Sequence, residues 1–213
     1  MPKHFSNLPK ELEQDNPEVF HTNKFSIETY DENGLLHSFN DEPSSVRRSY
    51  KNTISMFWYS HGESFRANNK PAYIELKHDS YRAYDENGSL HSYNDMPCII
   101  TYENNEWHMS WYKHGVSHRE NELPAQASWK KTLFNIKPIR LEREAYFEEG
   151  VLHRGRGLPA LFQLGDQNFL VKGVVHNTTG HASLHKKQNK ILSKKWSLYG
   201  VWVPEKDFDD FKN

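Results

Sequence analysis

The chain has 213 residues, 14% of them aromatic, and a formal net charge of −1 at pH 7. So many rings argue against a disordered chain, and the balanced charge argues against both a globally basic nucleic-acid binder and an acidic nucleic-acid mimic. No stretch approaches about 18 uncharged apolar residues, so we expect no membrane-spanning helix. Cys98 is the single cysteine, which excludes an intramolecular disulfide and a CxxC metal site and favours a reducing, cytoplasmic setting.

The first 24 residues are predicted to form an N-terminal cap. They lack the apolar core of a secretory signal, which agrees with a cytoplasmic location. The sequence LPKELEQD at 8–15 is typical of a short helix, with Asn7 placed to cap it and Pro9 in its first turn.

Internal repeats dominate the rest of the chain. Residues 30–43, YDENGLLHSFNDEP, and residues 84–97, YDENGSLHSYNDMP, match at eleven of fourteen positions. Each of five glycines is followed nine positions later by a proline and then by a small residue. These glycines are Gly34, Gly62, Gly88, Gly115 and Gly150, and the small residues are Ser44, Ala72, Cys98, Ala125 and Ala160. An aromatic ring stands four positions before each glycine, and a second ring stands three positions after it.

Two weaker copies follow around Gly173 and Gly200. The sequence therefore predicts about seven repeats of ~27 residues over 25–204, with an insertion near 130–143. Residues 205–213 are predicted to form a C-terminal tail that helps to close the array. Cys98 takes the small position after proline in its repeat, so we interpret it as a buried filler and not as a nucleophile.

Each glycine is predicted to lie in a β-hairpin turn. Asn-Gly, as in Asn33–Gly34, is a strong signal for a two-residue turn in which both residues have positive φ. In such a turn the ring four positions before glycine lies opposite the residue three positions after it, which is usually histidine. The expected fold is thus all-β, a tandem array of antiparallel hairpins with these rings on the core face.

The residues on the opposite strand face vary together. Aspartate at the third position before glycine accompanies serine at the fourth position after it, which predicts Asp–Ser hydrogen bonds, Asp31–Ser38 and Asp85–Ser92. Elsewhere an aromatic residue accompanies arginine, which predicts guanidinium groups over rings. Because such residues dominate binding hot spots, we expect this stripe to bind protein unless it packs between repeats. The stripe comprises Tyr59, Arg66, Tyr112, Arg119, Phe147 and Arg154.

The segment WYKHGVSHRENELPA at 111–125 resembles the MORN-variant repeats of uncharacterised bacteriophage and giant-virus proteins. The resemblance extends over roughly 25–204, and the segment between His-Arg and Pro-Ala is longer than in ordinary MORN repeats. It implies an all-β interaction scaffold without catalytic residues. A phage origin implies a small protein that binds and disables a host factor, such as an antiviral defence or toxin protein, in the host cytoplasm.

Enzymatic and metal chemistry have no visible machinery in the sequence. Successive hairpins should hold their histidines about 10 Å apart, whereas metal ligands converge at about 2 Å from one ion. We therefore predict no metal site among His37, His91, His118 and His153. Asp31, Glu32, Asp85 and Glu86 are interpreted as solvated turn residues, and no GxGxxG, Walker or GxSxG pattern occurs. The sequence predicts a binding protein with no catalytic residues and no cofactor.

A basic run at 185–195 supports an alternative function. Its lysines could contact phosphates, and nearby rings, Trp196, Tyr199 and Trp202, could stack on bases. The candidate nucleic-acid-binding residues are Lys186, Lys187, Lys190, Lys194 and Lys195. A second alternative is a component of a virion or an antitoxin.

Overall fold

The computed structural model describes residues 25–49, 52–130, 140–187 and 190–211. The expected all-β class is confirmed, since the described chain consists of antiparallel strands joined by tight turns with one short helical stretch near its C-terminus. The helix predicted at 8–15 lies outside the described residues. The chain divides into two compact units. The first takes the described residues up to Asn104 together with Trp111–Gly115, and the second takes Asn105–Ser110 and the residues from Val116 onward.

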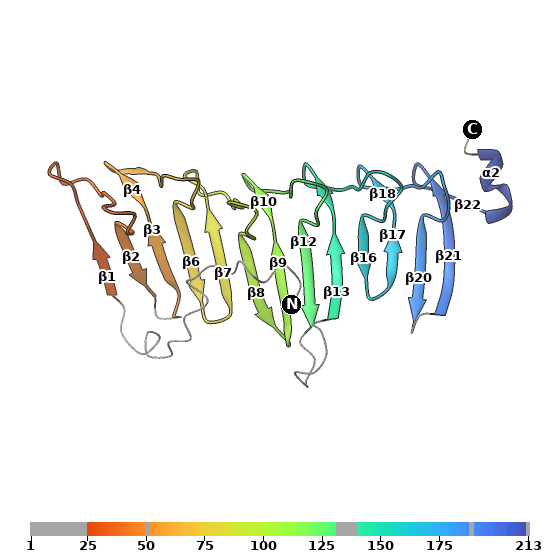
Figure 1. Ribbon diagram of the computed structural model, residues 1–213, viewed down its shortest axis with the longest axis horizontal. Coiled ribbons are helices and arrows are strands. Elements are labelled where there is room, and N and C mark those ends of the chain that lie inside the picture. Colours follow the sequence, from red (N-terminus) through yellow and green to blue (C-terminus); the bar gives the residue numbers. More distant parts are fainter. Residues whose placement is uncertain (1–24, 50–51, 131–139, 188–189, 212–213) are drawn as a thin grey trace. The chain divides into compact units, whose positions relative to one another are not determined.

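The first unit contains one antiparallel sheet whose strands follow one another in chain order (Figure 1). Each strand pairs with the next along the chain, as expected when short turns connect neighbours. The strands are β1 (Phe25–Glu28), β2 (Ser45–Arg48), β3 (Ile54–Phe57), β6 (Tyr73–Lys77), β7 (Ser80–Tyr84) and β8 (Ile99–Glu103). The unit also holds the short pair β4 (Tyr59–Ser60) and β5 (Glu63–Ser64), and β10 (Tyr112–Lys113).

The second unit has the same organisation. Its main strands are β9 (Glu106–Ser110), β12 (Gln126–Lys130), β13 (Arg140–Ala145), β16 (Leu161–Gln163), β17 (Asp166–Asn168), β20 (Ser183–Lys187), β21 (Lys190–Leu198) and β22 (Val201–Val203). Its short strands are β11 (Val116–Ser117), the pair β14 (Phe147–Glu148) and β15 (Val151–Leu152), and the pair β18 (Leu170–Val171) and β19 (Val174–Val175). The unit ends in η3 (Glu205–Asp207) and α2 (Phe208–Phe211), where Phe208 is buried.

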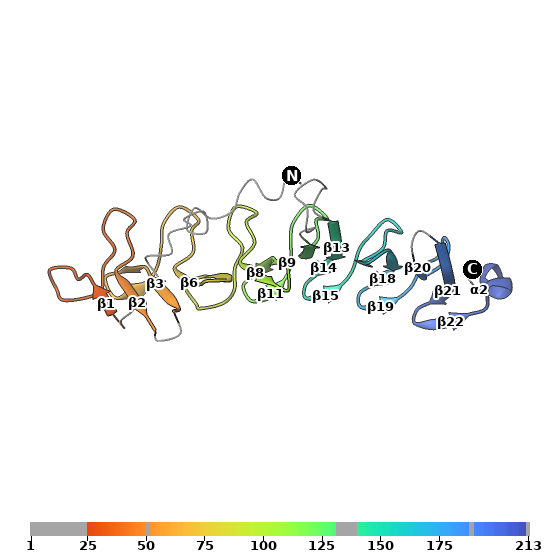
Figure 2. The same cartoon turned by 90° about the horizontal axis from the view of Figure 1, so that it is seen from below.

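The repeat contains two hairpin turns and not one. The glycine turns close the short pairs, such as β4–β5, which continue the main strands after a single residue. The main sheet turns back elsewhere, for example between Lys77 and Ser80. In Figure 1 the short strands lie at one end of the long ones, and in Figure 2 β15, β19 and β22 follow one another along the second unit.

The glycine turns are of two kinds, and the prediction for Asn-Gly is wrong. His61, His114, Glu149, Lys172 and Tyr199 have φ between 46° and 50°, each followed by a glycine with positive φ. These are the two-residue turns expected. In the repeat of Gly62 the backbone amide of Phe65 donates to the carbonyl of Trp58, so the ring four positions before glycine lies opposite the third residue after it.

Asn33 and Asn87 are not among the positive-φ residues. Their repeats use a wider turn in which only the glycine is left-handed, so Tyr30 lies opposite Leu36 instead of His37. The reason is the aspartate at the start of the turn, whose Oδ1 accepts the amides of Asn33 and Leu35 and thereby holds the wider loop.

The core forms where strand alternation and the repeat rings coincide. Trp58, Trp111 and Tyr146 are buried as expected, whereas Tyr30 in the first repeat is exposed. The small residues that follow the five repeat prolines are almost fully buried. They are Ser44, Ala72, Cys98, Ala125 and Ala160, and Ala182, which stands where the sixth repeat would have its proline, is buried as well. Burial raises the pKa of the Cys98 thiol to about 11, which keeps it protonated and unreactive.

Candidate functional site

The repeat histidines join consecutive repeats. Nδ1 of four of them accepts the backbone amide of the residue that precedes glycine in the next turn, so each of these rings holds the following turn in place. These bonds join His37 with His61 (3.2 Å), His91 with His114 (3.2 Å), His153 with Lys172 (3.2 Å) and His176 with Tyr199 (3.0 Å).

Two aspartates also reach from one repeat to the next. Oδ2 of Asp31 lies 2.6 Å from Nδ1 of His61, and Oδ2 of Asp85 lies 2.8 Å from Nδ1 of His114. The predicted Asp–Ser hydrogen bonds are replaced by these contacts. Ser38 and Ser92 instead accept the amides of Tyr59 and Tyr112 through their hydroxyl oxygens.

An aspartate and two histidines therefore meet twice in the first unit. The groups are Asp31–His37–His61 and Asp85–His91–His114, and in each one potential ligand atom per residue lies within 4.8 Å of the others. The participation of His61 and His114 is not evident from the sequence, because they occupy turn positions of a different repeat. The signal that could have found them is the pairing of Asp-containing repeats with following His-Gly turns.

Each cluster combines a buried carboxylate with an exposed imidazole. The Asp85 side chain is 1% exposed, while that of His114 is 60% exposed. The amide of Leu35, followed by the His61 ring, lowers the pKa of Asp31. Burial, followed by the nearby His114 ring, lowers the pKa of His91. The first effect favours the ionised form of Asp31, and the second favours the neutral form of His91.

The predicted arginine–ring contacts form, but with different rings. The Arg66 guanidinium lies 3.7 Å from the centroid of Trp58, and that of Arg154 lies 3.6 Å from the centroid of Tyr146. The sequence analysis predicts contacts with Tyr59 and Phe147, the residues that follow Trp58 and Tyr146 in the chain. The arginines stack on Trp58 and Tyr146, the two rings that are buried in the core.

The arginines of the predicted protein-binding stripe are largely enclosed. Arg119 is buried and donates to the carbonyl of Pro124, and Arg154 donates to the carbonyl of Pro159. Arg66 donates to both carboxylate oxygens of Asp41. These contacts favour a packing role for the arginines, while Tyr59, Tyr112 and Phe147 are half-buried. A direct role in protein binding stays a prediction.

The Asp41 contacts predict an acid-sensitive contribution to stability. Hydrogen bonds from Arg66 and then Lys70 lower the pKa of Asp41 to about 2. Because the folded-state pKa lies below the unfolded value, the stabilisation is present above about pH 4 and is lost as the pH falls toward 2. The free energy of unfolding, measured by urea titration at about pH 5 and at about pH 2.5, should fall less in Asp41→Asn than in the native chain. The two falls should differ by about 1 kcal/mol, because solvent screens this exposed ion pair. Equal losses in both proteins would contradict the assignment.

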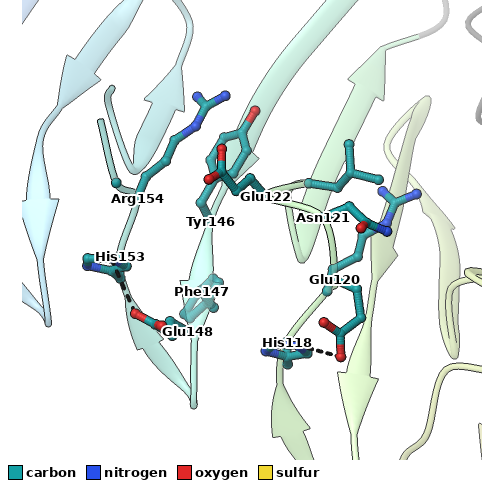
Figure 3. A pocket seen from close by; sticks show the side chains of 12 residues that line it. His118, Glu120, Asn121, Glu122, Tyr146, Phe147, Glu148, His153 and Arg154 are labelled. Atoms are coloured by element: carbon teal, nitrogen blue, oxygen red, sulfur yellow. Dashed lines mark ion pairs between the residues drawn. The ribbon is translucent and has the colours of Figure 1, made fainter. Parts of the chain in front are cut away.

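A cleft in the second unit separates two repeat loops (Figure 3). It has a volume of about 240 Å³ and is lined by residues 118–123, 146–148 and 153–155. His118 pairs with Glu120 and His153 pairs with Glu148, each at 3.2 Å. Phe147 and Arg154 of the predicted stripe reach this cleft. Its mixed charges can bind polar groups of a ligand.

A row of valines runs over the glycine turns of the second unit. Each valine directly follows a turn glycine, and Val116, Val151, Val174 and Val201 are 42%, 45%, 42% and 65% exposed. The row is held in place by the next turn, because a Cβ on Gly150 would lie 3.1 Å from Cγ1 of Val116, and one on Gly200 would lie 3.1 Å from Cγ1 of Val174. These four residues are called the valine row below. The sequence analysis did not single it out.

The basic segment forms a hairpin of β20 and β21. Lys187, Lys190, Lys194 and Lys195 are exposed, and Lys186 is half-buried. Lys194 and Lys195 are adjacent in an extended strand, so their side chains leave on opposite faces. Lys195 lies over the ring of Trp202, with Nζ 5.6 Å from the centroid. The lysines are therefore divided between two faces, and their binding of nucleic acid stays a prediction.

The chain matches no family model, no curated protein and no solved structure. Within the described ranges, no helix has the length and apolar composition that a bilayer crossing requires.

Proposed function

We propose that this protein is a non-enzymatic scaffold that binds another protein through the valine row of its second unit. The observation that carries the proposal is the repeated exposure of valine at the same position of successive turns. Tyr199, which is also exposed, lies in the same C-terminal turn as Val201. Contiguous exposed apolar surface is typical of protein-interaction sites.

Regular spacing makes the valine row suitable for an extended partner. Repeat arrays present neighbouring residues at fixed intervals, so several weak apolar contacts can form together. The partner is expected to offer a complementary apolar surface, with aromatic anchoring at Tyr199. The cleft lined by His118 and His153 would supply polar contacts beside it.

The resemblance to phage repeat proteins indicates the class of partner. On that basis the partner is a protein of a bacterial host, in its cytoplasm, and the binding is inhibitory. This part of the proposal rests on the resemblance and not on the geometry.

The test immobilises the full chain and measures how much of a bacterial host protein it retains. The native chain is compared with a variant changed at four sites and with a control variant. Val→Thr at all four positions of the valine row keeps the β-branched shape but removes apolar surface. Leu164→Asn is the control, since Leu164 is comparably exposed at a different turn and asparagine tolerates its positive φ. We expect the native chain and the control to retain the same partner and the Val→Thr variant to lose at least tenfold in affinity.

Two outcomes would redirect the proposal. Equal retention by all three proteins would contradict a role for the valine row. Material released by nuclease, and lost in a variant carrying Lys→Ala at the five lysines of 186–195, would support the nucleic-acid alternative instead. Thermal melting of each variant separates lost binding from lost folding.

A further inference from the structure

We propose that the clusters Asp31–His37–His61 and Asp85–His91–His114 each bind a divalent transition-metal ion, zinc above all, that links two consecutive repeats. The proposal is independent of protein binding by the second unit, because all six residues belong to the first unit. In the proposed arrangement one ion joins repeats 1 and 2, and another joins repeats 3 and 4.

The donor set fits zinc. Two imidazoles and one carboxylate are ligands that zinc accepts in an open site, where water takes the fourth position. The potential ligand atoms already lie within 4.8 Å of one another in both clusters. Tetrahedral zinc holds its ligands at about 2.0–2.2 Å, and therefore about 3.3 Å from one another. The Asp Oδ2 and His Nδ1 atoms, 2.6 Å apart in the first cluster and 2.8 Å apart in the second, would have to separate slightly to admit the ion.

The carboxylate is held in advance. Oδ1 of Asp85 accepts the amides of Asn87 (3.0 Å) and Ser89 (2.8 Å), which leaves Oδ2 directed at His114. Asp31 is fixed in the same way by Asn33 and Leu35. A carboxylate whose second oxygen is anchored loses little freedom on binding an ion.

The histidines are placed to move onto an ion. The ring centroids of His37 and His61 are 4.3 Å apart, as are those of His91 and His114. His61 and His114 are exposed, so their rings can turn without disturbing the core.

Metal binding exchanges two hydrogen bonds in each cluster. In the first cluster the ion replaces the proton between Nδ1 of His61 and Oδ2 of Asp31. The backbone amide of His61 loses its acceptor, Nδ1 of His37, which binds the ion instead. That amide lies at an exposed turn, where water can replace the lost acceptor. The exchange predicts moderate affinity and sites that empty reversibly.

The test is calorimetric titration of the tag-free full chain with zinc chloride at about pH 7.5, where histidine is mostly neutral. We expect two ions per chain in the stronger class of sites, one for each cluster. His61→Asn and His114→Asn should each remove one ion, and the double variant should remove both. Asparagine tolerates the positive φ of these turns, so the backbone should be retained.

The matched control is His185→Asn. His185 lies 2.6 Å from Asp166, but among the described residues this pair belongs to no cluster of three ligands. Its removal should leave the two stronger sites intact. Zinc should raise the melting temperature of the native chain and the control but not of the double variant. No zinc binding, or a titration that the double variant leaves unchanged, would overturn the proposal.

Discussion

Replacing Trp58 by alanine is expected to lower the free energy of unfolding by about 3–5 kcal/mol. The ring is 3% exposed, lies beneath the Arg66 guanidinium, and donates from Nε1 to the carbonyl of Asp41 at 2.9 Å. The substitution removes a large buried ring and leaves Arg66 without its stacking surface. Urea denaturation measures the loss, with far-ultraviolet circular dichroism as the signal because it reports on the backbone and not on tryptophan fluorescence.

Two further variants show whether position or burial matters. Tyr30→Ala changes the same position of the first repeat, where the ring is exposed, and should cost less than about 0.5 kcal/mol. Trp58→Phe keeps a ring under Arg66 but removes the bond to Asp41, so its loss should be intermediate. Similar losses for Trp58→Ala and Tyr30→Ala would contradict the assignment of the core.

Replacing Asp85 by alanine is expected to cost about 2–3 kcal/mol. The carboxylate is almost fully buried and accepts the amides of Asn87 and Ser89 as well as the His114 ring. Its removal frees the wider turn and breaks the contact between two repeats. The shift in urea midpoint, measured with metal chelator present, tests this structural role separately from metal binding.

The conservative variant distinguishes the two functions of Asp85. Asp85→Asn keeps an oxygen for the two turn amides but removes the charge facing His114, so we expect a loss of about 1 kcal/mol. Asp31→Ala should reproduce the Asp85→Ala effect, because Asp31 makes the equivalent contacts. A loss from Asp85→Asn as large as that from Asp85→Ala would show that the charge, and not the turn, dominates.

Several features follow from the sequence because they depend on neighbouring residues. The glycine period, with its fixed ring and proline spacings, predicts an all-β array of hairpins, and Cys98 is buried as expected, like the other small residues after proline. Rings four positions before glycine form the core at Trp58, Trp111 and Tyr146. Strand alternation and turn geometry act over a few residues, so a single chain reveals them.

Other features depend on how one repeat meets the next. The repeat pattern alone could not show that Arg66 covers Trp58 and not Tyr59, or that the valines of successive turns form one exposed row. It also could not place Asp85 beside His114, because these residues are 29 positions apart.

The sequence by itself therefore determined the repeat, the all-β class and part of the core, namely the small residues after proline and the rings of Trp58, Trp111 and Tyr146. The tertiary structure decided which polar side chains of different repeats share a site. The physical reason is register: a shift of one residue between strands sends a side chain to the opposite face, and that register is set by turn width and packing across repeats.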